Sequence, residues 1–234
     1  MMTYKSNFNF GILNCMNTLI IGGTSGLGLE IAKNMQGSGS EVYVTGRREL
    51  DEPSLHYEKF DLSAPDLSQR LGELVMKMPE INTVVYAAGY FQEGRITDLT
   101  EKQIEEMIDV GGRGLIYVVQ AILAKQDKLD ELITITSTSQ WTPRKLEPIY
   151  NFAKAGAAHF SNAMAEDGRV SKVLVAGPAG MDTAFWEGTG HDVSTMLDPA
   201  WVAGEVMKLR EDEYKYRFAK IMREPARVEI VETR

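Results

Sequence analysis

A short apolar stretch that runs directly into a cluster of glycines most constrains how this chain can fold. Thr18 to Ile21 precede the glycine-rich residues 22–28. From Leu27 onward, apolar residues recur at helical spacing, at Leu27, Ile31 and Met35. This order predicts a strand, a tight turn and a helix. Bare backbone in such a turn can approach a phosphate that faces the amino end of the helix. The alternative is an ordinary turn in which glycine supplies a positive φ.

The rest of the chain alternates apolar strands with helical stretches. Further strands are predicted at Val42 to Thr45, Leu55 to Phe60, Val84 to Ala88, Leu132 to Thr136, Val170 to Val175 and Arg227 to Val231. Helices are predicted at Pro65 to Met78, Thr100 to about Lys125, Ile149 to Glu166 and Pro199 to about Arg210. Tyr214 to Ile221 fit either a helix or a hairpin partner. The alternation predicts an α/β fold with a parallel sheet, helices on both faces and a ligand site beyond the carboxyl ends of the strands.

Three helix starts carry side-chain signals. Thr100 and Gln103 have the spacing of a capping box. Asp198 is expected to cap a helix that has proline at its first position. The helix at Pro65 is expected to carry Pro65 and Asp66 in its first turn.

Length and composition exclude several classes of protein. With 234 residues and no evident repeat or linker, the chain is predicted to form one domain over residues 17–234, with residues 1–16 as an extension outside the core. Its net charge of −8 argues against nucleic-acid binding. Cys15 is the only cysteine, so no intramolecular disulfide can form. No apolar run approaches the roughly 20 residues that span a bilayer. A cytoplasmic protein without membrane contact is expected.

Tyr150 and Lys154 lie four residues apart in a predicted helix. This spacing places a phenol and an ammonium group on one helix face. A positive charge at that distance is expected to lower the pKa of the tyrosine toward a range useful for proton transfer. Tyr216 and Lys220 repeat the spacing in the charge-rich tail, where a solvated helix face or strand is expected.

A hydroxyl at the end of the preceding strand separates the two copies of this pattern. Ser137 lies 13 residues before Tyr150, whereas Ala203 holds that position before Tyr216. Only Tyr150 therefore has a strand-end hydroxyl to work with. Thr138 and Ser139, one and two positions later, also carry hydroxyls and are alternatives to Ser137 in this role.

The ordered motifs together resemble those of the short-chain dehydrogenase/reductase family. Gly22, Gly26 and Gly28 match its T-G-x-x-x-G-x-G turn, with Ile21 where threonine is usual. Tyr86-Ala87-Ala88-Gly89 is similar to its N-N-A-G segment, although both asparagines are replaced. Residues 178–183 resemble its P-G-x-x-x-T segment, with alanine in place of the first glycine. The resemblance spans residues 17–183 in the family's order and implies a Rossmann-type, doubly wound sheet.

The resemblance implies an oxidoreductase that transfers a hydride between a nicotinamide cofactor and a carbonyl or alcohol substrate, with no metal. Tyr150 would pass the proton, Ser137 would hydrogen-bond the reacting oxygen and Lys154 would hold the nicotinamide ribose. The residues expected to bind the cofactor are Gly22, Thr24, Ser25, Gly26, Leu27, Gly28, Arg47, Asp61, Ala87, Ala88, Gly89, Tyr150, Lys154, Pro178 and Thr183.

The end of the second predicted strand favours NADP over NAD. An acidic side chain there would bind the ribose 2′-hydroxyl, whereas Gly46 leaves room and Arg47 can pair with a 2′-phosphate. Two adjacent arginines in a solvated loop are the alternative. Asp61 resembles the family's adenine-contacting aspartate, but an aspartate capping the helix at Pro65 would look similar.

Gly111 stands where the family usually carries an asparagine that supports a proton-relay water. A close helix contact or a kink would explain glycine there, and the relay would then run through water or backbone. A second hypothesis is therefore a dinucleotide-binding sensor or scaffold with little turnover. The intact Ser137, Tyr150 and Lys154 set favours the enzyme.

The segment after Thr183 occupies the position of the family's mobile substrate lid. Its residues Phe185, Trp186, Gly188, Gly190, His191 and Met196 supply hinges and apolar cover, and Trp141, Tyr90 and Phe91 follow strand ends. Either these rings line a pocket for an apolar or aromatic carbonyl compound, or they only pack under a loop. His191 is expected at the surface. The resemblance also implies a homo-dimer or homo-tetramer that forms through the helix from Thr100 and the helix of Tyr150.

Overall fold

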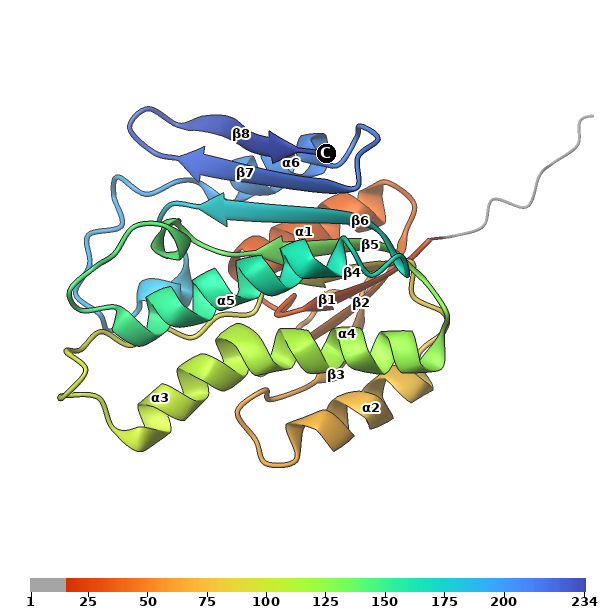
Figure 1. Cartoon of the computed structure of the whole chain (residues 1–234), viewed down its shortest axis with the longest axis horizontal. Coiled ribbons are helices and arrows are strands. Elements are labelled where there is room, and N and C mark those ends of the chain that lie inside the picture. Colours follow the sequence, from red (N-terminus) through yellow and green to blue (C-terminus); the bar gives the residue numbers. More distant parts are fainter. Residues whose placement is uncertain (1–15) are drawn as a thin grey trace, which may run out of the picture.

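The computed structural model describes residues 16–234, in which one eight-stranded sheet carries helices on both faces (Figure 1). The strands are β1 Asn17–Ile21, β2 Glu41–Gly46, β3 His56–Lys59, β4 Thr83–Tyr86, β5 Leu129–Ile135, β6 Val170–Pro178, β7 Tyr216–Met222 and β8 Arg227–Thr233. The helices are α1 Gly26–Gly37, α2 Leu67–Lys77, α3 Glu101–Ile108, α4 Gly114–Lys125, α5 Pro148–Met164 and α6 Pro199–Leu209. Short turns of helix are η1 Asp109–Arg113, η2 Thr138–Gln140 and η3 Ala184–Trp186. The predicted extension lies, apart from Met16, outside the described residues.

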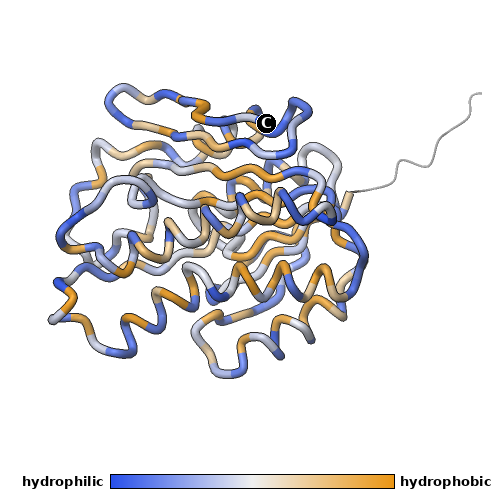
Figure 2. Tube along the Cα trace, viewed as in Figure 1, coloured by the Kyte–Doolittle hydropathy of each residue, from blue (hydrophilic) through white to orange (hydrophobic). Residues whose placement is uncertain are grey.

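Alternating side chains of the central strands divide the core into two layers. In β1, Leu19 and Ile21 pack toward α2, α4 and α5, whereas Ile20 packs toward α1 and α6. All three side chains are fully buried. Figure 2 shows the resulting hydrophobic band along the strands and on the helix sides that face them. The predicted α/β sheet with helices on both faces is confirmed.

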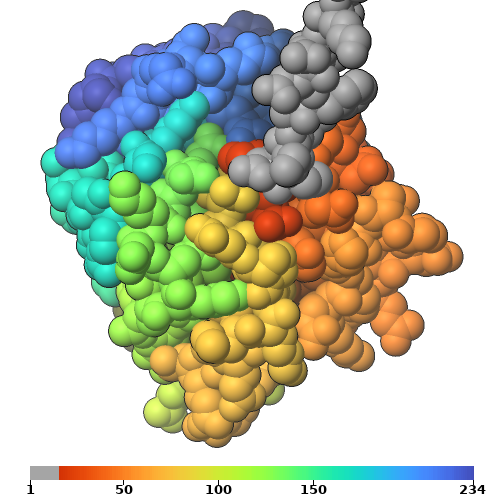
Figure 3. Space-filling view, turned by 90° about the vertical axis from the view of Figure 1, so that its right-hand side faces the viewer, coloured from red at the N-terminus to blue at the C-terminus, as the bar shows by residue number. Residues whose placement is uncertain are grey.

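The strand order places a crevice beside β1. The sheet runs β3-β2-β1-β4-β5-β6-β7-β8, and β1 pairs in parallel with both β2 and β4. The chain leaves the carboxyl end of β1 toward β2 and the carboxyl end of β4 toward β5, in opposite directions along the sheet. An opening therefore remains between the two segments. Figure 3 views the opposite edge, where the start of the described chain (red) lies between the residues around 40–60 (orange) and the C-terminal part (blue).

The C-terminal hairpin settles the open prediction for the tail. Residues 216–222 form a strand that extends the parallel sheet, and β8 returns antiparallel as the edge strand. Of the two expectations for Tyr216 and Lys220, the strand is confirmed, and the solvated helix face is wrong because Tyr216 is only 3% exposed. On a strand, Tyr216 and Lys220 stand about 13 Å apart, too far for a phenol–ammonium pair.

Helix α2 begins two residues later than predicted. Asp66 adopts the left-handed conformation with φ of 57° and serves as the N-cap residue, so Pro65 and Asp66 precede the helix. The capping box of Thr100 and Gln103 is confirmed by bonds in both directions, and Asp198 caps α6 through the amide of Ala200. Sequence patterns thus locate caps well where the capping side chain makes the bond itself.

The long helical stretch Glu101–Lys125 contains one turn of π-helix, η1, between α3 and α4. This stretch is the one helix among residues 16–234 long and apolar enough to cross a membrane by length and composition. Gly111 lies in η1, and a Cβ atom there would stand 2.8 Å from the Cβ atom of Ala153 in α5. The close helix contact predicted for Gly111 is found, and in place of the alternative, a kink, the structure has a turn of π-helix.

Two adjacent glycines of η1 provide a matched test of this contact. A Cβ atom at Gly112 would meet nothing within 4 Å. We expect Gly111→Ala to destabilise the protein by about 1–3 kcal/mol through overpacking against α5. Gly112→Ala should be neutral or stabilise it by up to about 1 kcal/mol, because alanine favours helix. Denaturant unfolding of both variants measures the difference, and equal stabilities would contradict the packing argument.

Candidate functional site

The glycine-rich turn brings three strand ends into direct backbone contact. The amides of Gly22 and Gly23 both donate to the Thr45 carbonyl at 3.0 Å. Gly22 has a φ of 86°, and a Cβ atom there would stand 2.6 Å from the Ala88 amide nitrogen. A Cβ atom at Gly28 would collide with the Gly22 carbonyl oxygen. Glycine is therefore needed at both positions for close approach, and at Gly22 also for the backbone conformation.

This turn opens into a cleft of about 1110 Å³ at the carboxyl ends of the strands. Every residue predicted to bind cofactor or to act in catalysis lines it, from the turn to Thr183. Ser25, the N-cap of α1, makes no side-chain bond to the first turn of the helix. The backbone amides of that first turn therefore remain available to an anionic ligand. The cleft is large enough for a dinucleotide and has an anion-binding end. Its residues fit such a cofactor.

Arg47 and Asp61 lie together at the β2 side of the cleft. Burial alone would raise the pKa of Asp61, but hydrogen bonds from Ser63 and the charges of Arg47 and Arg70 hold it below its usual value. The Asp61 carboxylate accepts from the Ser63 amide at 3.0 Å and the Ser63 hydroxyl at 2.8 Å. Because α2 begins at Leu67, Asp61 does not cap that helix.

Ser137, Tyr150 and Lys154 converge where β5 ends against α5. Tyr150 is 9% and Lys154 4% exposed. The Lys154 Nζ atom lies 5.7 Å from the centre of the Tyr150 ring and donates to the Ile135 carbonyl at 3.2 Å. Of the three neighbouring hydroxyls, that of Ser137 acts on the pKa of Tyr150, whereas Thr138 and Ser139 bond Arg144 and Glu147. This arrangement favours Ser137 over the neighbouring positions.

Burial, more than any charge, controls the protonation of this group. It raises the pKa of Tyr150 far above its usual value, opposed by the Ser137 hydrogen bond and Arg144 and reinforced by Glu147. It also lowers the pKa of Lys154 to about 8. The expected lowering of the tyrosine pKa by Lys154 is therefore wrong for this structure. The loss of hydration outweighs the opposing effects of the Ser137 hydrogen bond and the Arg144 charge.

A buried polar cluster beside Ser137 was not predicted from the sequence. The Ser139 hydroxyl donates to the Glu147 carboxylate at 2.7 Å and accepts from Arg144 at 2.6 Å. Arg144 also reaches the Thr138 hydroxyl at 2.8 Å. The only sequence signal was the Arg144–Glu147 spacing before Pro148, which is common on solvated surfaces.

The segment after Thr183 contributes Phe185, Trp186 and His191 to a cluster of rings beside Tyr150, which Phe91 completes from the loop after β4; these four rings are called the aromatic cluster. The Phe91 ring meets the Tyr150 ring edge-on, with centroids 5.1 Å apart. His191 lies 4.9 Å from Trp186 and pairs with Glu93 at 3.3 Å. His191 is exposed, as expected, and it also lines the cleft.

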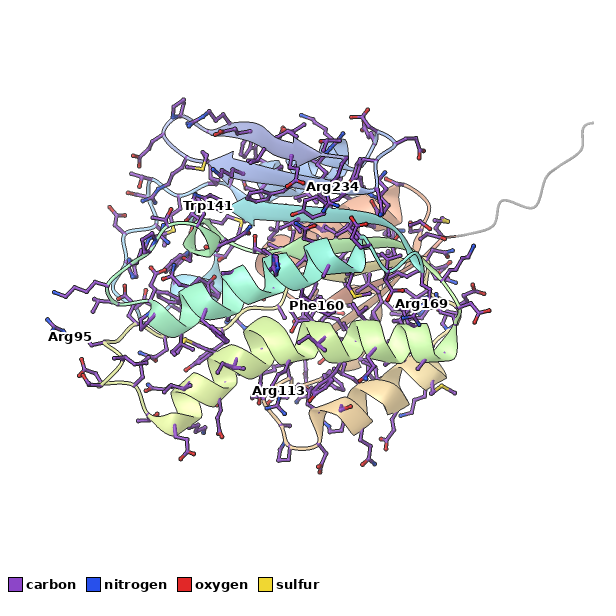
Figure 4. All side chains as sticks on the ribbon, viewed as in Figure 1. Arg95, Arg113, Trp141, Phe160, Arg169 and Arg234 are labelled. Atoms are coloured by element: carbon purple, nitrogen blue, oxygen red, sulfur yellow. The ribbon has the colours of Figure 1, made fainter. Side chains whose placement is uncertain are left out.

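Trp141 does not line the cleft, contrary to one of the two expectations. Its ring packs on the sheet, 5.6 Å from the Phe218 ring and 4.9 Å from the Lys220 ammonium (Figure 4). A Cβ atom at Gly177 would stand 2.6 Å from this ring. Turn η2 carries Trp141 over β6 and away from Tyr150.

The desolvated Lys154 predicts a gain in stability on its removal. Lys154→Met keeps the volume and removes the buried charge, so we expect about 2 kcal/mol of stabilisation at pH 7. The folded pKa lies below the unfolded one, so the penalty is complete below pH 8 and fades as pH rises toward 10.5. Unfolding at pH 7 and pH 10 measures it. The prediction fails if the variant is less stable at pH 7 or if its gain does not shrink at pH 10.

Comparison with known proteins agrees with the geometry. Residues 16–194 match the family model described as short chain dehydrogenase. An uncharacterised oxidoreductase of Staphylococcus epidermidis is 27% identical over 203 residues, covering 81% of this chain and 88% of that protein.

Two solved structures share the fold. A short-chain dehydrogenase from Streptomyces avermitilis has a TM-score of 0.75 at 18% identity and covers 89% of each chain. One from Sphingobium yanoikuyae, in complex with NADPH, has a TM-score of 0.72 at 20% identity and covers 82% of this chain and 83% of its own. The order of motifs, the cleft and the family match have one explanation: this chain belongs to the short-chain dehydrogenase family of oxidoreductases.

Proposed function

We propose that this protein is an NADP-dependent reductase or dehydrogenase that acts on a carbonyl or alcohol group. One observation carries the proposal: Ser137, Tyr150 and Lys154 meet in the same cleft as the glycine-rich turn. A protein that only binds a dinucleotide has no need of this hydroxyl, phenol and ammonium together. When bound, the nicotinamide supplies or accepts the hydride.

The roles follow from the chemistry of each group. In reduction, Tyr150 donates its proton to the developing alkoxide, a role that suits a phenol kept protonated by burial. Ser137 donates a hydrogen bond to the same oxygen and stabilises its charge. Lys154, which lines the same cleft, would hold the hydroxyls of the nicotinamide ribose when the cofactor is bound.

Arg47 supports NADP as the preferred dinucleotide. It lines the cleft beside Asp61, where no acidic side chain ends β2. Arg48 is held by Glu187 of the lid at 3.6 Å, so Arg47 is the better placed cation for a 2′-phosphate. The similar Sphingobium yanoikuyae enzyme was solved with NADPH.

The aromatic cluster favours a substrate with an apolar or aromatic body. Phe91, Phe185 and Trp186 form one wall beside Tyr150 and exclude water from the reacting carbon. We further propose a homo-oligomer through α4 and α5. On these helices Ile116 is 42% and Phe152 63% exposed, which suits an apolar contact between copies.

Tyr150→Phe tests the catalytic role. With a panel of ketones, aldehydes and quinones, we expect the variant to lose NADPH oxidation by about 10²–10⁴-fold, because the proton donor is gone. NADPH affinity, measured by fluorescence, should stay near wild type. Tyr216→Phe removes a buried hydroxyl outside the cleft and serves as the control.

The alternative function has its own signature in this assay. Tight NADPH binding without oxidation by wild type, and no difference on Tyr150→Phe, would contradict the enzyme and support a dinucleotide-binding sensor.

Arg47→Ala tests the cofactor preference. Loss of the pairing cation should weaken NADPH binding by about 10–100-fold, as expected for a charge-assisted contact worth 1.5–3 kcal/mol. NADH affinity should change little. The control is Arg95→Ala, since Arg95 points away from the molecule on an exposed loop (Figure 4). Equal binding of NADH and NADPH by wild type would contradict the preference for NADP.

A further inference from the structure

A row of hydrogen bonds leads from Ser137, whose hydroxyl acts on the pKa of Tyr150, to a buried carboxylate. The Ser137 hydroxyl donates to the Ser139 hydroxyl at 3.3 Å, and Ser139 donates to Glu147 at 2.7 Å. Ser139 is 3% and Glu147 9% exposed, and all four side chains line the cleft. Arg144 is paired with Glu147 at 3.3 Å.

The chemistry of the end members gives the row one direction. A carboxylate only accepts and a guanidinium only donates. The Ser139 hydroxyl therefore donates its single hydrogen to Glu147 and accepts hydrogen bonds from Arg144 and Ser137. Ser137 can then donate to Ser139 while accepting from Tyr150. In this orientation the row can pass a proton toward Glu147 by shifting each hydrogen to the next oxygen, and once its hydroxyls have turned it can pass one back toward Tyr150.

The other polar neighbours of Tyr150 offer no comparable row. Lys154 donates to the Ile135 carbonyl, which cannot pass a proton on. Gly111, opposite Ala153, brings no polar side chain to this end of α5. Within residues 16–234, the hydrogen-bonded hydroxyls that connect the Tyr150 end of the cleft to a carboxylate are thus those of Ser137 and Ser139, which lead to Glu147.

We propose that Ser137, Ser139 and Glu147 form a proton path that reloads Tyr150 between turnovers, with Arg144 as the positioning residue that holds it together. This proposal rests on the proposed function. After reduction has taken the phenolic proton, Glu147 takes up one proton from water in the cleft, and the Ser139 and Ser137 hydroxyls turn toward Tyr150. Glu147 then donates its proton to Ser139 as Ser139 donates to Ser137 and Ser137 donates to the phenolate, so that one proton enters and one reaches Tyr150. In oxidation each proton moves the opposite way and leaves through Glu147.

Rapid-mixing kinetics separates reloading from chemistry. Glu147→Gln and Ser139→Ala should leave the first turnover of NADPH near the wild-type rate, because Tyr150 starts protonated. Their steady-state rates should fall by about 10-fold or more, as expected for loss of a positioned acid–base group. Small buffer acids should restore part of the rate. A merely structural role would slow the first turnover as much as the later ones.

Matched controls lie elsewhere in the fold. Glu131→Gln disturbs a buried carboxylate paired with Arg210, and Ser161→Ala removes a buried hydroxyl bonded to Thr134. Neither should change the ratio of first-turnover to steady-state rate. The path is refuted if Glu147→Gln and Ser139→Ala also leave this ratio unchanged.

A neutron structure of the deuterated protein tests the path without any turnover. We expect one deuterium between Ser139 and Glu147 and one between Ser137 and Ser139, both directed toward Glu147. A deuterium directed from Ser139 to Ser137 would overturn the proposal whatever the activity. Correct deuterium positions in a protein that oxidises no NADPH would count against the proposed function instead.

Discussion

The contact between the backbones of Gly22 and Ala88 is the constraint on which the site depends. No side chain fits between them, and the same turn hydrogen-bonds the end of β2 through Thr45. Three strand ends are thus held at one level. Because β1 lies where the strand order reverses, the segments beyond these ends diverge and leave a cleft instead of closing it.

The same arrangement explains why residues far apart in the chain act together. Ser137 ends one central strand, and Tyr150 and Lys154 lie on the helix that packs against it. Parallel strands bring all their carboxyl ends to one edge, so each following loop contributes to the same cleft. The close contact of η1 with Ala153 then sets the depth of α5, and glycine at position 111 is what permits that depth.

Burial gives the site its chemistry at a cost in stability. It keeps the Tyr150 phenol protonated and places Lys154, with a pKa of about 8, near its point of titration at physiological pH. The aromatic cluster strengthens both effects by excluding water. A buried lysine whose ammonium has one carbonyl partner lowers the stability of the folded protein. Its retention agrees with a functional requirement.

By itself, the sequence determined the elements, their order and the chemistry-bearing residues. Hydrophobic period, glycines and caps are local signals, so Gly22, Ser137 and Tyr150 were found without coordinates. Tertiary structure alone decided which rings line the cleft, since Trp141 packs on the sheet while the exposed His191 contacts Trp186. It also decided the direction of the Tyr150 pKa and the position of Glu147. These properties depend on burial and on partners far along the chain, which no local pattern encodes.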